Sequence, residues 1–283
     1  MGIIQMDWIL ILVFVLMLCS SRYNMADSGN EITLDLVRQS LERQEDTIVF
    51  CLIERSRFLT NSPLYNQSLN LVPGFSGSLV SFIVKETEAI HSKARRYENP
   101  EENPFFPENL PHSVVPPHDY PKFLHHPGAS ININKQIWDM YFNQLLPLFV
   151  DKGDDGNYAL TASNDLTCLQ ALSRRIHYGK FVAEVKFREA PHEYEPAIRA
   201  KDKDALMNML TFKSVEETVK KRVEKKAMVF GQDVTLGNNT IAEKYKVDPS
   251  VLSHLYDQWV MPLTKLVQVE YLLRRLDPED ARS

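Results

Sequence analysis

Two cations in one helical stretch of the chain are spaced so that they can act on the same molecule. Arg175 and Lys186 are eleven residues apart. At roughly 100° per residue they return to nearly the same helix face, about 16 Å apart along the axis. Two cations could then face one cavity and stabilise negative charge there. A pair of surface residues with their charged ends in water has the same spacing, and spacing alone favours that interpretation.

Thr264 and Gln268 form a second candidate pair near the C-terminal end. They are four residues apart, so they share a helix face and offer a hydroxyl and an amide donor. Taken alone, they would be polar residues at the edge of a core.

Motifs for several other kinds of chemistry are incomplete. A possible calcium loop at Asp151 has Gly153 and Ala162 where ligands are needed. The stretch from Gly74 to Gly77 is not a G-x-S-x-G elbow, no Gly-rich phosphate loop occurs, and the eight histidines form no H-E-x-x-H pair. We therefore predict no metal and no cofactor.

Composition excludes further classes of function. The 283 residues carry a formal charge of -5 and contain no basic stripe, so nucleic acid is not expected as a partner. With 44% hydrophobic residues the chain can bury a large core. Its three cysteines, Cys19, Cys51 and Cys168, provide neither a disulfide framework nor a cysteine zinc site. The body of the chain fits a reducing compartment.

The elements that must position these side chains are predicted to be helices. Apolar residues recur at intervals of three, four and seven, and no long alternating run indicates a sheet. The segment 99–127 holds eight of the sixteen prolines and several aromatics, so we expect an ordered irregular connection. We predict one all-α, multi-helix domain with long first, middle and last helices. The expected helices are 34–59, 78–97, 133–150, 165–188, 195–210, 214–230 and 249–276, the last kinked at Pro262.

Residues 1–25 differ from the rest and leave two alternatives open. The apolar run 9–18, followed by small residues at 19–21, resembles a secretory signal. The residues before it include Asp7 and no Lys or Arg, and Met25 would make an ordinary second start, so these residues could equally be an upstream extension. The run is too short to span a bilayer, which needs about 20 apolar residues. We expect no stable membrane association of the mature body.

Several longer stretches resemble the eukaryotic chorismate mutases, the plant members especially. They occur in the family's order across residues 31–278, so the signal is more specific than any short motif. This resemblance implies an all-helical catalytic domain that rearranges chorismate to prephenate, on the route to phenylalanine and tyrosine, without a cofactor. The stretches are 41–48, 53–56, 104–107, 173–187 and 269–276.

The resemblance also assigns roles to six residues. Arg38 and Arg175 would clamp the two carboxylates of chorismate. Lys186 and Gln268 would donate to its ether oxygen, Glu216 would accept from its ring hydroxyl, and Thr264 would help to hold a carboxylate. We expect all six in one closed pocket, with buried, unpaired cations. Such cations argue against the competing interpretation, a non-catalytic helical interaction protein.

Two positions depart from the fungal members of the family. Gln268 stands where they carry Glu, and an amide can donate at any pH whereas a carboxyl must be protonated to do so. We therefore expect activity that is broad across neutral pH. Phe212 stands where they carry Asn, so a polar contact from that position is not expected.

Regulated relatives bind an aromatic amino acid at the dimer interface through paired arginines and a Gly-Ser. Arg95 and Arg96 match the arginines, but Ala159 and Leu160 occupy the Gly-Ser positions. The hydroxyl is lost and a bulky side chain is gained. The resemblance is therefore closest to the unregulated cytosolic plant isoform. We expect a cytosolic homodimer insensitive to tryptophan, tyrosine and phenylalanine, or a secreted protein if residues 1–21 act as a signal.

Overall fold

Helices are the only regular elements in the described part of the chain, as the sequence predicts. The structure is a computed structural model that describes residues 32–108, 110–232 and 245–279. The proposed leader at 1–25 lies outside these residues. The described helices belong to one compact unit that begins at Leu34. No strand occurs within the described ranges, which confirms the all-α prediction.

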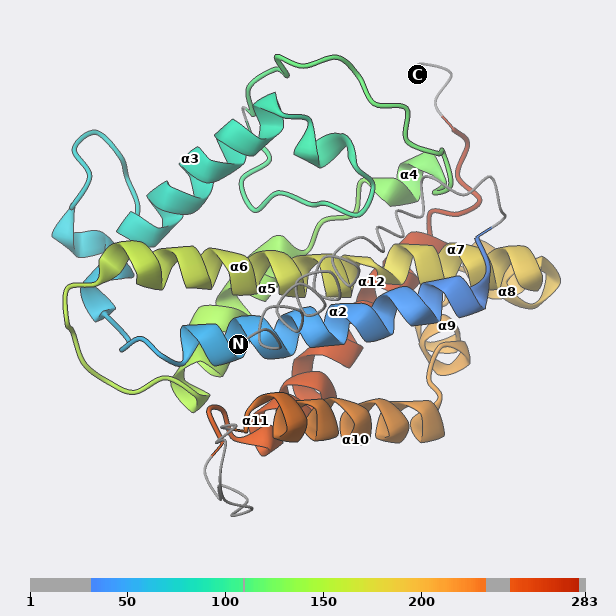
Figure 1. The fold of residues 1–283 in the computed structure, drawn as a ribbon. Helices are drawn as coiled ribbons and strands as arrows, with labels where there is room; N and C mark the ends of the chain where they lie inside the picture. Colours follow the sequence, from blue (N-terminus) through green and yellow to red (C-terminus); the bar gives the residue numbers. More distant parts are fainter. Residues whose placement is uncertain (1–31, 109, 233–244, 280–283) are drawn as a thin grey trace, which may run out of the picture. The chain divides into compact units, whose positions relative to one another are not determined.

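Two layers of long helices carry the core (Figure 1). Helix α2 (Leu34–Arg55) packs along α6 (Tyr158–His177), and α7 (Gly179–Glu189) packs on α12 (Met261–Leu272). Apolar side chains at helical spacing, such as Leu52 of α2, are fully buried between these elements. Many charged residues between them in sequence lie on the outer faces. Some are buried and paired, as in the 2.5 Å ion pair of Arg55 on α2 with Asp165 on α6.

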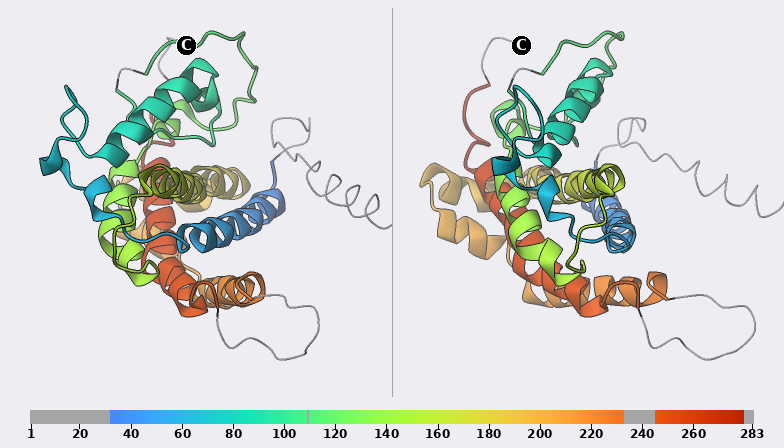
Figure 2. Two further views of the ribbon diagram at one scale, coloured as in Figure 1. Left: turned by 60° about the vertical axis from the view of Figure 1, so that its left-hand side comes forward. Right: turned by 90° about the vertical axis from the view of Figure 1, so that its left-hand side faces the viewer.

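The remaining helices lie on two sides of the α2 and α6 pair. Helix α3 (Leu79–Lys93) and the proline-rich segment lie on one side, and α10 (Lys213–Phe230) with α11 (Pro249–Leu255) lies on the other (Figure 2). The described residues of segment 99–125, which leave out residue 109, contain no helix. The other elements are η1 (Ser62–Leu64), η2 (Gln67–Leu69), η3 (Arg96–Glu98), α4 (His126–Ala129), α5 (Asn134–Met140), η4 (Tyr141–Leu145), η5 (Leu146–Leu148), α8 (Pro191–Arg199), α9 (Lys203–Met209) and η6 (Tyr256–Val260).

The helix expected at 165–188 is two consecutive helices, α6 and α7. Tyr178, between them, keeps right-handed helical dihedrals with φ -60° and ψ -15°, so the chain continues in nearly the same direction. The 11-residue spacing from Arg175 to Lys186 therefore still places both on one side. The helix α6 begins earlier than expected, at Tyr158.

The helix expected at 195–210 is interrupted by a turn. Lys201 adopts the left-handed conformation with φ 52°, which ends α8. Asp202 then caps α9 by accepting a hydrogen bond of 2.9 Å from the amide of Ala205.

The last helical stretch contains a wide turn before its proline. The π-helical element η6 precedes Met261, and Pro262 occupies the first turn of α12. The wider turn accommodates a residue that lacks an N–H and whose ring crowds the preceding turn. Helix α12 ends at Leu272, earlier than the expected Leu276.

Candidate functional site

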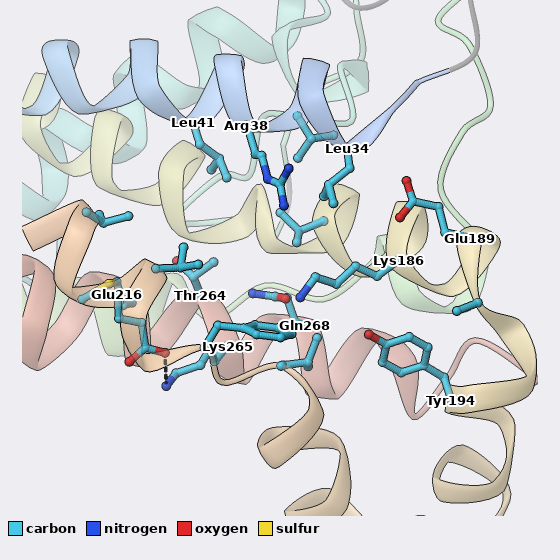
Figure 3. A pocket seen from close by; sticks show the side chains of 18 of the residues that line it. Leu34, Arg38, Leu41, Lys186, Glu189, Tyr194, Glu216, Thr264, Lys265 and Gln268 are labelled. Atoms are coloured by element: carbon cyan, nitrogen blue, oxygen red, sulfur yellow. Dashed lines mark hydrogen bonds and ion pairs between the residues drawn. The ribbon is translucent and has the colours of Figure 1, made fainter. Parts of the chain in front are cut away.

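A cavity of about 430 Å³ lies where α2, α7, α10 and α12 meet. Its size is within the usual range for small-molecule sites. The six residues singled out in the sequence come from five helices and all line it: Arg38, Arg175, Lys186, Glu216, Thr264 and Gln268. In Figure 3 the side chains of Arg38, Lys186 and Gln268 extend toward one another across this space.

Arg175 is the buried cation of the cavity, with a side chain from the last turn of α6. The residue is 5% exposed, and its Nη1 donates to Thr264 Oγ1 over 3.3 Å. Its guanidinium lies 5.7 Å from the ring centroid of Tyr256. The Nε atom is buried without an acceptor. A carboxylate placed here would meet a guanidinium with unused hydrogen-bonding capacity.

Thr264 and Gln268 lie on one face of α12, as their spacing predicts, and Gly179 lets them approach α7. A Cβ atom at Gly179 would lie 2.7 Å from the carbonyl oxygen of Thr264 and 3.3 Å from Cγ of Gln268. Any larger residue would push α12 away from α7. Gln268 is 6% exposed, and its Oε1 has no hydrogen-bond donor. The sequence thus places an amide and a hydroxyl at the cavity wall through a close contact between helices.

Lys186 shares its part of the cavity with one further cation, Arg38, and with the carboxylate of Glu189. Its Nζ is 4.5 Å from the ring centroid of Phe212, at the start of α10. Burial lowers the pKa of Lys186, the nearby charge of Arg38 lowers it further, and Glu189 acts in the opposite direction. These two cations repel each other, and a dianion bound between them would relieve that repulsion.

The expectation of buried, unpaired cations is wrong for Arg38. Its side chain is 62% exposed and its Nη1 forms a 3.2 Å ion pair with Asp35 on the same helix. The residue is in the first turns of α2, at the rim of the cavity, where the helix leaves the core. An exposed pair of this kind is worth little, so Arg38 can exchange Asp35 for another carboxylate at small cost.

Lys265 also belongs to the site, although the motifs and spacings in the sequence did not single it out. Lys265 Nζ forms a 2.9 Å ion pair with Oε1 of Glu216, which joins α12 to α10 (Figure 3). Glu216 is therefore not a free acceptor, because one of its oxygens is already engaged. Lys265 directly follows Thr264, and a polar residue beside a candidate donor is the one signal that could have pointed to it.

The residues of the expected effector site lie in two separate places in one chain. Arg95 and Arg96 follow α3, whereas Ala159 and Leu160 lie in the first turn of α6, and these ends are far apart in Figure 1. Arg95 donates to both carboxylate oxygens of Glu98, over 2.6 and 2.7 Å. Arg96 pairs with Glu102 over 3.0 Å. Both arginines are thus engaged within the chain.

The described residues were also compared with the requirements of a metal site and of a membrane span. They contain no group of three His, Cys, Asp or Glu side chains placed to hold a metal ion. None of the helices among them has the length and apolar character needed to cross a membrane.

Comparison with known proteins identifies the family. The family model of chorismate mutase type II matches residues 157–269. Chorismate mutase 2 of Arabidopsis thaliana is 63% identical over 259 residues, covering 89% of this chain and 98% of the relative. The cytosolic chorismate mutase 2 of Zea mays is 56% identical, covering 89% and 99%.

Solved structures agree with this result. A crystal structure of AtCM1 with tyrosine bound in its allosteric site superposes with a TM-score of 0.80 at 53% identity, covering 89% of this chain and 99% of the other. Sequence and fold are therefore shared over nearly the whole described body. The chain belongs to the plant-type eukaryotic chorismate mutases, the enzymes that isomerise chorismate to prephenate.

Proposed function

We propose that this chain binds chorismate in the cavity between α2, α7, α10 and α12 and rearranges it there. The observation that carries this proposal is the convergence of six chemically suited residues, from separate helices, on one cavity. Four cationic side chains line it, namely Arg38, Arg175, Lys186 and Lys265. Three carboxylates also line it, those of Glu189, Glu193 and Glu216, and the last is paired with Lys265. The other three cations are therefore the ones that would meet the two carboxylates of the substrate.

The reaction requires only positioning and charge stabilisation. In the [3,3] rearrangement the ether C–O bond breaks as a new C–C bond forms within one molecule, so no group leaves and no proton is consumed. The enzyme must hold a chair-like conformer and stabilise negative charge on the ether oxygen. We assign the carboxylates to Arg175, assisted by Thr264, and to Arg38 at the rim. Lys186 and Gln268 would donate to the ether oxygen.

Two of these roles require the residues to change partners or share them. Arg38 would release Asp35 when a substrate carboxylate arrives, and the planar guanidinium can bind that carboxylate through two nitrogens. Glu216 can keep its ion pair with Lys265 through Oε1 while Oε2 accepts from the ring hydroxyl. Lys265 would then hold the carboxylate of Glu216 in a fixed orientation.

The direct test is loss of chorismate absorbance with purified protein that starts at Met25. The wild-type chain should convert chorismate to prephenate, and Arg175→Ala should bind it weakly and turn it over slowly. An inactive, folded wild-type chain would refute the proposal. An Arg175→Ala variant as active as the wild type would show that the reaction does not take place in this cavity.

The amide at position 268 should give activity that varies little with pH. Gln268 donates in every protonation state, so we expect kcat to be nearly constant from pH 6 to 8. Gln268→Glu should retain turnover at acidic pH and lose it as pH rises through the pKa of the new carboxyl, about 4.3 or higher when buried. Profiles of kcat against pH for both proteins provide the comparison. A steep loss of wild-type activity between pH 6 and 8 would contradict this role.

We also propose that aromatic amino acids do not regulate this enzyme. Arg95 and Arg96 are engaged by Glu98 and Glu102, and Leu160 places a bulky side chain where the relatives carry a small one. Adding tryptophan, tyrosine or phenylalanine at millimolar concentration should change the rate by less than twofold. A several-fold change with any of the three would refute the proposal.

A cytosolic homodimer is the proposed state of the mature protein. The maize relative is named cytosolic. Ile90 on α3 is 66% exposed and Leu160 on α6 is 52% exposed, and these large apolar side chains could be covered by a second copy. Light scattering should give twice the mass of the chain. Sequencing the mature N-terminus distinguishes a start at Met25 from cleavage of a signal.

A further inference from the structure

The junction of α6 and α7 is held from the side opposite the cavity. Arg174, His177 and Lys180 follow one another at intervals of three residues and so lie on one face. At about 100° per residue, this face is roughly opposite to Arg175 and Lys186. Each of the three side chains bonds to the region between residues 102 and 133.

The contacts of His177 and Lys180 are buried, whereas the side chain of Arg174 is 41% exposed. Arg174 forms an ion pair with Glu102. His177 is 2% exposed, and its Nε2 accepts a 2.9 Å hydrogen bond from the amide of Ile133. Lys180 is 1% exposed, and its Nζ donates to Asn103 Oδ1 over 2.9 Å and to the carbonyl of Ala129 over 2.8 Å. A buried ammonium held by neutral oxygens is costly, so its place depends on both acceptors.

The segment that supplies Glu102 and Asn103, residues 102–106, is itself fixed and is called the brace below. The buried carboxylate of Glu88 on α3 accepts from the amides of Phe105 and Phe106 over 2.7 and 2.8 Å. Asn134 on α5 donates through Nδ2 to the carbonyl of Asn103 over 2.8 Å. The brace therefore connects the α6–α7 junction to two other helices through short hydrogen bonds.

The cavity side of the junction has weaker anchors. Arg175 donates one 3.3 Å hydrogen bond to Thr264, and its Nε has no acceptor. The side chain of Asn103, by contrast, leaves its own Nδ2 buried without an acceptor while its Oδ1 holds Lys180. An unsatisfied donor of this kind reduces stability. The side-chain amide of Asn103 is thus oriented to bind Lys180, although this leaves its own NH2 group without an acceptor.

We propose that Asn103 is a positioning residue for the rearrangement, acting through Lys180 to fix the α6–α7 junction so that Arg175 and Lys186 face the substrate. Glu102 supports the same junction through Arg174. This inference rests on the proposed roles of Arg175 and Lys186. Because an error of about 1 Å in a reacting group can reduce a rate about 100-fold, a brace distant from the substrate can affect turnover.

The test compares Asn103→Leu with Asn103→Asp and with Asn132→Leu. Leucine removes the acceptor for Lys180, whereas aspartate keeps one. Asn132 binds the carbonyl of Pro104 in the same brace over 2.8 Å and serves as the matched control. We expect Asn103→Leu to lower kcat per folded molecule about tenfold with KM changed less than threefold. Asn103→Asp should restore most of kcat, and Asn132→Leu should remain near wild type.

Hydrogen exchange supplies a readout that does not depend on catalysis. Backbone amides of residues 174–186 should exchange faster in Asn103→Leu than in wild type or Asn132→Leu, when all are measured well below their unfolding temperatures. Unchanged exchange there, or kcat per folded molecule within twofold of wild type, would overturn the inference. If the wild-type chain proved inactive, the proposed function would fall while the exchange experiment still tested the brace.

Discussion

Replacing Lys186 by methionine is expected to lower kcat by about 100-fold to 1,000-fold and to change KM by only a few-fold. Methionine keeps the apolar stem of the side chain and removes the charge. In the proposed mechanism that charge acts on an ether oxygen that becomes negative only as the C–O bond breaks. The loss should therefore fall mainly on the chemical step. Steady-state kinetics with chorismate provides both constants.

The matched control for this variant is Lys203→Met. Lys203 lies on α9, its side chain is 64% exposed, and it pairs with Glu270 away from the cavity. The Lys203→Met substitution should leave kcat and KM near their wild-type values, since an exposed ion pair contributes little to stability. If Lys186→Met retained kcat within threefold, the ammonium would not be acting on the transition state. A large rise in KM with unchanged kcat would instead assign Lys186 to substrate binding.

Local signals in the sequence were sufficient to predict the positions of most of the helices. The period of apolar residues located α2 and α10, and Asp248 with Pro249 marked the start of α11 correctly, with Asp248 accepting from the amide of Ser250. The end of α8 was missed because Lys201 adopts a left-handed conformation that its residue type does not favour. Tertiary contacts stabilise such a turn, and periodicity carries no information about them.

The residues of the candidate site were predictable where the family resemblance named them. Their exposure and their ion-pair partners were not, because contacts between helices determine both. Spacing placed Arg175 and Lys186 on one side, and the structure puts both at one cavity. The exposure of Arg38 depends on the point at which α2 leaves the core, and the sequence of the helix does not predict that point. The ion pair from Lys265 to Glu216 joins residues 49 positions apart, which meet because α10 and α12 both border the cavity.

Acidification is expected to destabilise the fold through His177. Burial, together with the charge of Lys180, lowers the pKa of His177 to about 3. In the unfolded chain its pKa is about 6.5, so between these values the unfolded state binds more protons. The stabilising contribution is complete above pH 6.5 and is lost as pH falls. From pH 6.5 to 5 the free energy of unfolding should fall by about 2 kcal/mol from this group. Denaturant unfolding at several pH values measures it.

Comparison with His177→Gln isolates this contribution from the other acid groups. The glutamine can offer an oxygen to the amide of Ile133 but cannot take up a proton. From pH 6.5 to 5 the free energy of unfolding of the variant should therefore fall by about 2 kcal/mol less than that of the wild type. Equal pH dependence in both proteins would contradict the assignment. Protonation would also place a second charge beside Lys180 and replace the acceptor for Ile133 with a donor. Because the pKa of His177 in the folded chain is about 3, that protonation is confined to strongly acidic solution, and turnover per folded molecule should not fall on its account between pH 6.5 and 5.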